Sequence, residues 1–172
     1  MAKKFRLLLL DAGIVIKLFE MGLWDRLLER CEVHLSRTIA AEAHFWVDDE
    51  GQRRDFDLAS YEASGAITVF DVTLAQDAEL TKPFGLDYLE RFDAGEREAL
   101  AHLVTSPLPY AICSADSIVF KVLGFLHRAE QGVSLEEILQ RTGFRRQMPW
   151  QFSKAFREKY TREGFCDGLG AT

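Results

Sequence analysis

A short apolar run that ends at a charge constrains the fold of this chain more than any other feature. The residues from Phe5 to Leu10, dominated by four consecutive leucines, have the continuous apolar character of a strand that is buried on both faces. Asp11 follows directly, and a carboxylate cannot lie in a core without a partner. From Ala12 to Phe19 the apolar residues change to helical spacing. This stretch therefore predicts a buried parallel strand followed by a helix.

The same alternation continues along the chain. Three more strands are predicted, at residues 32–35, 66–70 and 110–113, with helical patterns between them. One of these helices is expected to start near Thr38 and to continue through Trp46 before a polar loop. Because strands alternate with helices, we expect an α/β fold with a mostly parallel central sheet of four to five strands.

Composition places the chain among globular proteins. Its 172 residues are 48% hydrophobic, which suits one domain with a real core. No apolar stretch approaches the roughly 20 residues that span a bilayer, so no membrane contact is expected. The three cysteines are odd in number and widely spaced, and they form neither a disulfide framework nor a zinc pattern. We therefore expect buried thiols in the reducing cytoplasm.

Four acidic residues each end a patterned segment, and they are the main indication of function. Asp11 and Asp116 follow predicted strands, where open α/β sheets bind ligands, and Glu42 and Glu96 lie on predicted helices. Carboxylates that converge repel one another unless a cation neutralises them. Oxygen ligands suit a hard ion such as Mg²⁺ or Mn²⁺. A metal site is the functional interpretation of this set.

Each acid also has a purely structural interpretation, which the sequence leaves open. Asp11 and Asp116 are good N-caps for the helices that follow them. Glu96 fits an acidic first helical turn, and Glu42 fits a solvent-facing position on a helix. The joint placement of the four is more informative than any one of them.

The order of these segments resembles that of the PIN-domain family. The resemblance lies in a hydrophobic strand ending in Asp, a helix with Glu, a Gly-Glu-x-Glu-Ala helix and a strand ending in Ser-x-Asp. The segments 7–16, 95–103 and 111–116 account for most of it, and 132–139 resembles a terminal element of some PIN-like proteins. The similarity covers residues 5–140, although 47–85 matches nothing within it.

The resemblance implies a three-layer α/β/α sandwich and a Mg²⁺- or Mn²⁺-dependent ribonuclease. It implies metal ligation by Asp11, Glu96 and Asp116, with Glu42 as the fourth acid; many members have Asp where this chain has Glu96. Ser114 is a further catalytic candidate, able to bond a carboxylate, a metal-bound water or the scissile phosphate. A toxin-like role, an antitoxin-like protein partner and a homodimer are further expectations.

The C-terminal part differs from the rest in charge. We expect a PIN-like domain over residues 1–143 and a basic, aromatic helical extension over 144–172 that packs on it. The net charge is −6, yet residues 141–162 hold seven basic residues and one acidic one. Because RNA affinity comes largely from neutralised phosphates, the expected contacts to single-stranded RNA are Arg145, Arg146, Lys154, Arg157 and Lys159.

Two other functions stay open at this stage. The first is a PIN-like module that binds RNA or protein with little or no catalysis, in which the basic segment docks onto an acidic partner. The second is a phosphoacceptor domain of the receiver type, which also uses clustered acids and Mg²⁺. Its only candidate phosphoacceptor is Asp71, after the strand at 66–70.

Overall fold

A computed structural model describes residues 5–9 and 11–170 of the chain, so Leu10, expected at the end of the first strand, lies outside the described residues. Five strands form one sheet in which every pairing is parallel, in the order β5-β2-β1-β6-β7. The strands are β1 (Phe5–Leu9), β2 (Cys31–Ser36), β5 (Ile67–Phe70), β6 (Ala111–Cys113) and β7 (Gly132–Val133). The predicted α/β class with a parallel sheet is confirmed.

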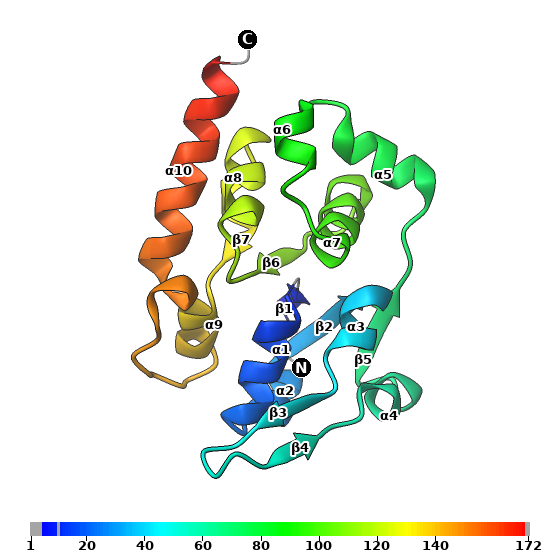
Figure 1. Cartoon of the computed structure of the whole chain (residues 1–172), viewed down its shortest axis with the longest axis vertical. Coiled ribbons are helices and arrows are strands. Elements are labelled where there is room, and N and C mark those ends of the chain that lie inside the picture. The colour runs from blue at the N-terminus through cyan, green and yellow to red at the C-terminus, as the bar shows by residue number, and fades with distance from the viewer. Residues whose placement is uncertain (1–4, 10, 171–172) are drawn as a thin grey trace.

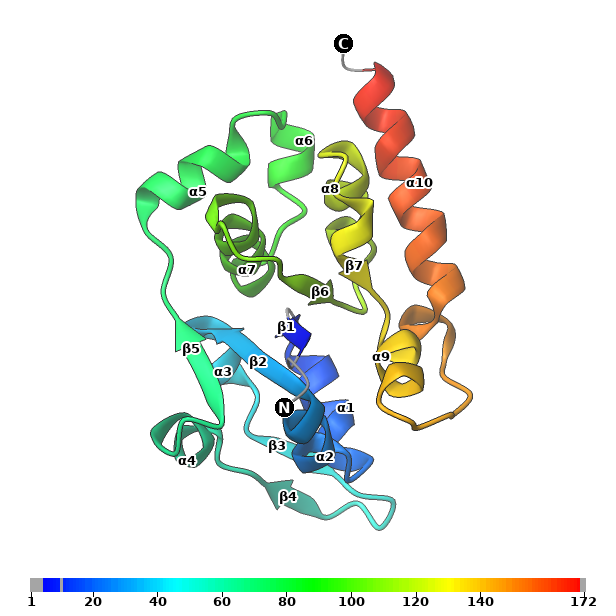
Figure 2. The ribbon, with the colours of Figure 1, turned by 180° about the vertical axis from the view of Figure 1, so that it is seen from behind.

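Helices cover both faces of the sheet (Figures 1 and 2). One layer contains α1 (Ala12–Glu20), α2 (Trp24–Arg30), α3 (Arg37–Glu42) and α4 (Leu58–Ala63). The other contains α5 (Leu74–Thr81), α6 (Leu86–Leu89), α7 (Ala94–Thr105) and α8 (Ser117–Phe125). Between them Leu7, Val33 and Ile112 of three adjacent strands are buried, which places the core on both sides of β1. This arrangement is the expected three-layer α/β/α sandwich.

A two-stranded hairpin replaces the end of a predicted helix. The helix expected to continue through Trp46 ends at Glu42, and Trp46 lies in β3 (Phe45–Val47), which pairs antiparallel with β4 (Arg53–Asp55). The prediction failed because Phe45-Trp46-Val47 is an aromatic and β-branched run, which favours a strand. Gly51 at φ +75° forms the turn, and the ring of Trp46 stacks on Phe19 of α1.

The last helix packs closely along α8. A short 3₁₀ turn, η1 (Ala129–Gln131), precedes β7 and α9 (Leu135–Arg141). A second one, η2 (Trp150–Phe152), leads into α10 (Lys154–Gly170), the last described helix. A Cβ atom at Gly164 would overlap the carbonyl oxygen of Lys121, and one at Gly124 would overlap that of Thr161. The two backbones approach so closely because glycine stands on both sides of the contact.

The described helices differ from those that cross a bilayer. None of those in residues 11–170 combines the length and the apolar character needed to span a membrane.

Candidate carboxylate site

The chain reverses its direction of strand addition between β1 and β6. From β1 the next strands, β2 and β5, are added on one side, whereas β6 and β7 lie on the other side. Leu9 of β1 is in register with Cys113 of β6, so the residues that follow these two strands meet at one edge of the sheet. Open α/β sheets bind ligands at such a switch point, outside the carboxyl ends of the strands.

Asp11 and Asp116 lie together at this switch point. Each caps the helix that follows it: Asp11 Oδ1 accepts the Gly13 N–H at 2.6 Å, and Asp116 Oδ1 accepts the Ile118 N–H at 3.0 Å. Burial raises the pKa of Asp11, and the charges of Asp93 and Asp116 raise it further, against N–H bonds from Gly13 and Ala115. Both residues therefore serve as N-caps, and they also lie close enough for the charge of Asp116 to affect Asp11.

Glu96 joins the two aspartates from the first turn of α7. It forms a capping box with Asp93, in which Asp93 accepts the Glu96 N–H at 2.9 Å and Glu96 accepts the Asp93 N–H at 3.4 Å. Only 3% of Glu96 is exposed. Burial, followed by the charges of Asp116, Asp93 and Asp11, raises its pKa to about 8. Three of the four predicted acids, together with Asp93, thus form one electrostatic group, the carboxylate cluster.

Glu42 is exposed as the last residue of α3. Within the described residues, no hydrogen bond or ion pair joins it to the other three acids. Thr38 of the same helix donates to Glu98 of α7 at 2.8 Å, which holds α3 against α7. Because Glu42 follows Thr38 by four residues, both lie on the same face of α3. The structure therefore places Glu42 on the helix face directed at α7 but shows no contact with the carboxylate cluster.

Ser114 is fully buried at the turn between β6 and α8. Its Oγ accepts the Asp116 N–H at 2.9 Å, so in this structure it shapes the turn that presents Asp116. A direct contact of Ser114 with a substrate requires this turn to open.

The side chains of the carboxylate cluster do not converge on one common position. Among residues 5–9 and 11–170, no three His, Cys, Asp or Glu side chains are placed to hold one metal ion. Asp11, Glu96 and Asp116 each have one oxygen committed to a backbone N–H at a helix start. The donor set suits a hard cation, and ligation by three of these acids requires their side chains to rotate toward one another.

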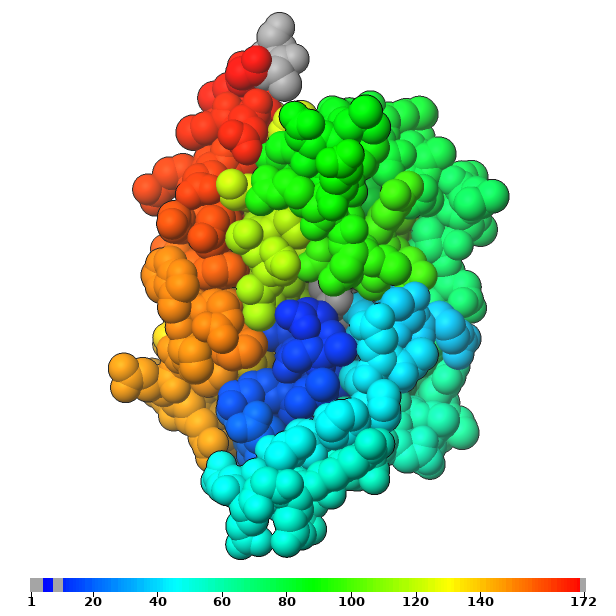
Figure 3. Space-filling model, viewed as in Figure 1, coloured from blue at the N-terminus to red at the C-terminus, as the bar shows by residue number. Residues whose placement is uncertain are grey.

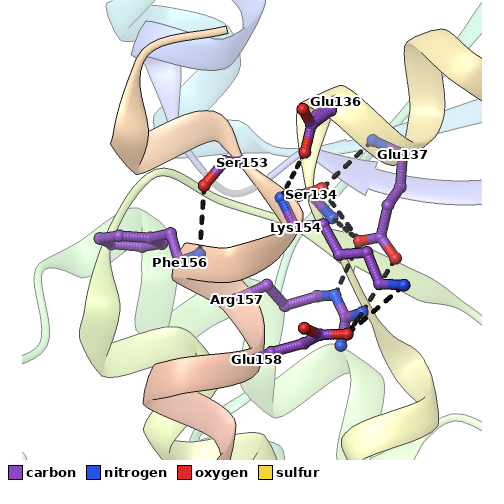
Figure 4. Close-up of polar contacts among 8 residues, drawn as sticks. All are labelled: Ser134, Glu136, Glu137, Ser153, Lys154, Phe156, Arg157 and Glu158. Atoms are coloured by element: carbon purple, nitrogen blue, oxygen red, sulfur yellow. Dashed lines mark hydrogen bonds and ion pairs between the residues drawn. The ribbon is translucent and has the colours of Figure 1, made fainter.

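The basic C-terminal segment is held on the domain by an ion pair. Figure 4 shows Arg157 of α10 reaching Glu137 at the start of α9, with Nε–Oε2 at 2.7 Å and Nη2–Oε1 at 2.9 Å. Only 14% of either side chain is exposed. The Lys154 N–H also donates to Glu136 at 2.7 Å. Arg157, predicted to contact RNA, is therefore engaged inside the protein.

The other predicted RNA contacts are exposed. Lys154 and Lys159 make ion pairs of 3.5 and 4.0 Å with glutamates one turn later in α10, and such surface pairs are weak. Arg145 and Arg146 lie in the segment between α9 and η2. In Figure 3 this orange segment shares a face with the blue and cyan regions that contain α1 and α3. Arg146 lines a pocket with Lys17, Glu20 and Met21, at the end of α1 away from Asp11.

The histidines take no part in the carboxylate cluster. His102 stacks on Phe70, with ring centroids 4.0 Å apart, and both His34 and His102 contact Tyr110 edge-on or tilted. Burial lowers the pKa of His34 and of His102, so both are neutral at pH 7. They pack against aromatic side chains of the interior and serve a structural role.

Two residues of this region were not assigned from the sequence. Asp93 stands three residues before Glu96, and Asp-x-x-Glu before an apolar helix is the signature of a capping box, but this signature does not indicate a place beside Asp11. Glu98 follows Glu96 by two residues and so faces another side of the helix, and no sequence signal indicates its bond to Thr38 across the chain.

Comparison of the chain with protein-family models, with curated proteins and with solved structures gives no match.

Proposed function

We propose that the chain is a Mg²⁺- or Mn²⁺-dependent endoribonuclease of the PIN type, with a toxin-like role. The observation that supports it is the convergence of Asp11, Glu96 and Asp116 at the switch point between β1 and β6. Residues from three distant segments meet where α/β sheets bind ligands, in the order in which PIN domains have their metal-binding acids.

The electrostatics of Glu96 support a cation at this place. A buried carboxyl beside three other acids has a pKa of about 8, so it retains its proton at neutral pH unless a positive charge arrives. A divalent ion removes this repulsion, and Asp11, Glu96 and Asp116 would hold it, with Glu42 on the adjacent face of α3. Such an ion lowers the pKa of bound water and stabilises charge on a phosphoryl group.

The residues around the cluster have definite tasks in this proposal. The capping bonds to Gly13 and Ile118 fix Asp11 and Asp116 at the strand ends, and the Ser114 hydroxyl fixes the turn before Asp116. Burial of Glu96 limits the access of bulk water. The exposed arginines, Arg145 and Arg146, would attract the phosphate backbone of single-stranded RNA to the protein.

Cleavage of a mixed RNA pool, with Mn²⁺ and with EDTA, tests the proposal. We expect cleavage only with the ion, and loss of cleavage in Asp116→Asn. Asp87→Asn is the matched control, because Asp87 is exposed on α6 and makes the same change of charge elsewhere. Cleavage that persists in EDTA, or in Asp116→Asn, contradicts the proposal.

Metal binding has its own test, which does not depend on activity. An ion that binds only the folded state raises the free energy of unfolding, by about 2.7 kcal/mol at a hundredfold excess over Kd, and so raises the melting temperature. Asp11→Asn should reduce this gain while the fold is kept, and Asp87→Asn should not. An equal metal response in Asp11→Asn and in the wild type removes Asp11 from the site.

A binding module with little catalysis is the second candidate. It is favoured by the finding that no three possible ligands in the described part of the chain are placed on one ion. RNA binding without cleavage in Mn²⁺ would identify the chain as such a binding module. The receiver-type alternative has less support, because Asp71 follows the edge strand β5 and pairs with Arg37 at 3.4 Å, with 74% of its side chain exposed.

A further inference from the structure

A pocket of about 370 Å³ lies directly beside the carboxylate cluster, where α5, α7 and the segment before α7 meet. Val72, Leu74 and Phe92 give it an apolar side, and Asp93 and Glu98 give it an acidic side. Asp93 also belongs to the cluster, since it caps α7 through the Glu96 N–H at 2.9 Å. The volume lies in the range of small-ligand sites. A molecule in this pocket therefore lies against Asp93, which bonds the backbone of Glu96.

One polar atom of this pocket wall has no partner. Glu98 Oε1 accepts the Thr38 hydroxyl at 2.8 Å, whereas Glu98 Oε2 is buried without a hydrogen bond. The other polar groups are used: Arg97 makes a two-bond ion pair with Asp77, and Thr73 caps α5. A buried acceptor without a donor is costly, and a ligand that supplies an N–H recovers that cost.

The charge of the pocket decides which part of a nucleotide it takes. Asp77 and Arg97 neutralise each other, which leaves the negative charges of Asp93 and Glu98. A phosphate is repelled from such a place, whereas a base with N–H donors is attracted. Leu74, 89% exposed at the start of α5, offers an apolar surface to the face of a base.

Resting on the proposed function, we propose that this pocket receives the base of a nucleotide next to the scissile phosphate and that Glu98 determines which base enters. Rotation of the carboxylate turns Oε2 toward the pocket, where it accepts an N–H from the exocyclic amino group of cytosine or adenine. Uracil presents its O4 acceptor at the position of the cytosine amino group. The carboxylate repels that oxygen, so the pocket favours amino-bearing bases over uracil.

Nucleoside binding in EDTA tests the base pocket without any cleavage. Cytidine and uridine are titrated into protein with ¹³C-labelled methyl groups, and the signals of Val72 and Leu74 are followed by NMR. We expect saturable shifts at both residues and binding of cytidine at least about tenfold tighter than that of uridine. Absence of shifts at Val72 and Leu74, or equal binding of the two nucleosides, overturns the proposal.

Variants separate recognition by Glu98 from a general effect. Glu98→Gln keeps the size of the side chain and an oxygen for the Thr38 hydroxyl but adds N–H donors, so the preference for cytidine should vanish or reverse. Glu130→Gln, at an exposed position on η1, is the matched control and should keep the preference. Leu74→Ser should weaken the binding of both nucleosides by the same factor, because it removes only an apolar contact with the base. A preference that survives in Glu98→Gln overturns the proposal.

The two proposals can fail separately. Nucleoside binding with the expected preference, but no RNA cleavage in Mn²⁺, contradicts the proposed nuclease activity and supports the proposed base pocket. Metal-dependent cleavage with the same base preference in wild type and Glu98→Gln supports the proposed nuclease activity and contradicts the proposed base pocket.

Discussion

Two capping boxes in this protein share one local design and differ completely in their surroundings. At the start of α7 Asp93 and Glu96 exchange backbone bonds, and at the start of α9 Ser134 and Glu137 do the same. Glu96 is surrounded by carboxylates and has its pKa raised to about 8 by burial and by their charges. Burial also acts to raise the pKa of Glu137, but bonds from Arg157 and Ser134 hold it below its ordinary value.

The difference shows that a capping box fixes where a glutamate lies and not what it does. The glutamate that meets an arginine from a distant helix becomes a structural clamp. The one that meets other acids keeps its proton near neutral pH, because burial and the negative charges of its neighbours disfavour ionisation. Sites that bind cations or exchange protons are expected among groups of the second kind.

The largest expected difference between the two boxes is in cleavage. Glu96→Gln should lower RNA cleavage in Mn²⁺ by about 10³-fold or more, equivalent to about 4 kcal/mol of transition-state stabilisation. Glu137→Gln makes the same chemical change in the same motif and should retain the rate per folded molecule. Rates are compared at a temperature where circular dichroism shows both variants folded. Equal losses in the two variants would contradict the separation of site from clamp.

Stability should show the reverse order. Arg157→Met leaves Glu137 partly buried without its partner and should lower the free energy of unfolding by about 3 kcal/mol, measured by urea denaturation. The double variant Arg157→Met/Glu137→Met removes both charges and should recover much of this loss. If the double variant recovers none of this loss, the loss does not come from an unpaired buried charge on Glu137.

The pH dependence of stability should have opposite signs at the two boxes. The unfolded Glu96 ionises near pH 4.5 and the folded one near 8, so the folded state holds an extra proton between these values and loses stability as pH rises. Glu96→Gln should remove this loss, which has a limiting slope of about 1.4 kcal/mol per pH unit. Glu137 has a lowered pKa, so its contribution is present above pH 4.5 and is lost in acid.

These slopes are read from urea denaturation at pH 5, 7 and 8.5 without metal, with Glu130→Gln as the control. A Glu96→Gln curve parallel to that of the wild type would show that Glu96 is not the protonated group.

The smallest effect concerns the exposed arginines next to the clamp. Changing Arg145 and Arg146 to alanine should weaken RNA binding for all sequences and reduce the salt dependence by roughly one unit of slope per lost phosphate contact. Metal binding should persist, because the carboxylates are unchanged. An unaltered slope, measured by fluorescence anisotropy, would mean that this segment contacts a protein partner or serves packing.

Much of the sheet and half of the site environment could be predicted from local pattern. The continuous apolar run before Asp11 and the strand before Asp116 indicate parallel strands that end in N-caps, and both features are present. The hairpin β3–β4 was missed because the helical spacing of Ile39 and Ala43 was extended through Trp46. The two-residue strand β7 is too short to leave a pattern.

Contacts between distant residues could not be predicted in the same way. The engagement of Arg157 by Glu137 depends on where α10 lies, and a run of basic residues does not reveal which of them is paired. The close approach of α8 and α10 does leave a trace, since Gly164 and Gly168 stand four residues apart on one helix face. Glycine at such spacing permits contact between backbones, but it does not name the partner helix.

The central position of β1 has a consequence for the order in which the protein is made. β1 is the first described strand to be synthesised, yet its neighbour β6 follows only after β2 and β5. Asp11 and Asp116 are more than 100 residues apart in the chain, and α8, which Asp116 caps, packs on α10, the last described helix. A nascent chain on the ribosome therefore contains the first carboxylate long before the other acids join it. The proposed capacity to cut RNA would therefore arise only after the residues up to Asp116 have left the ribosome.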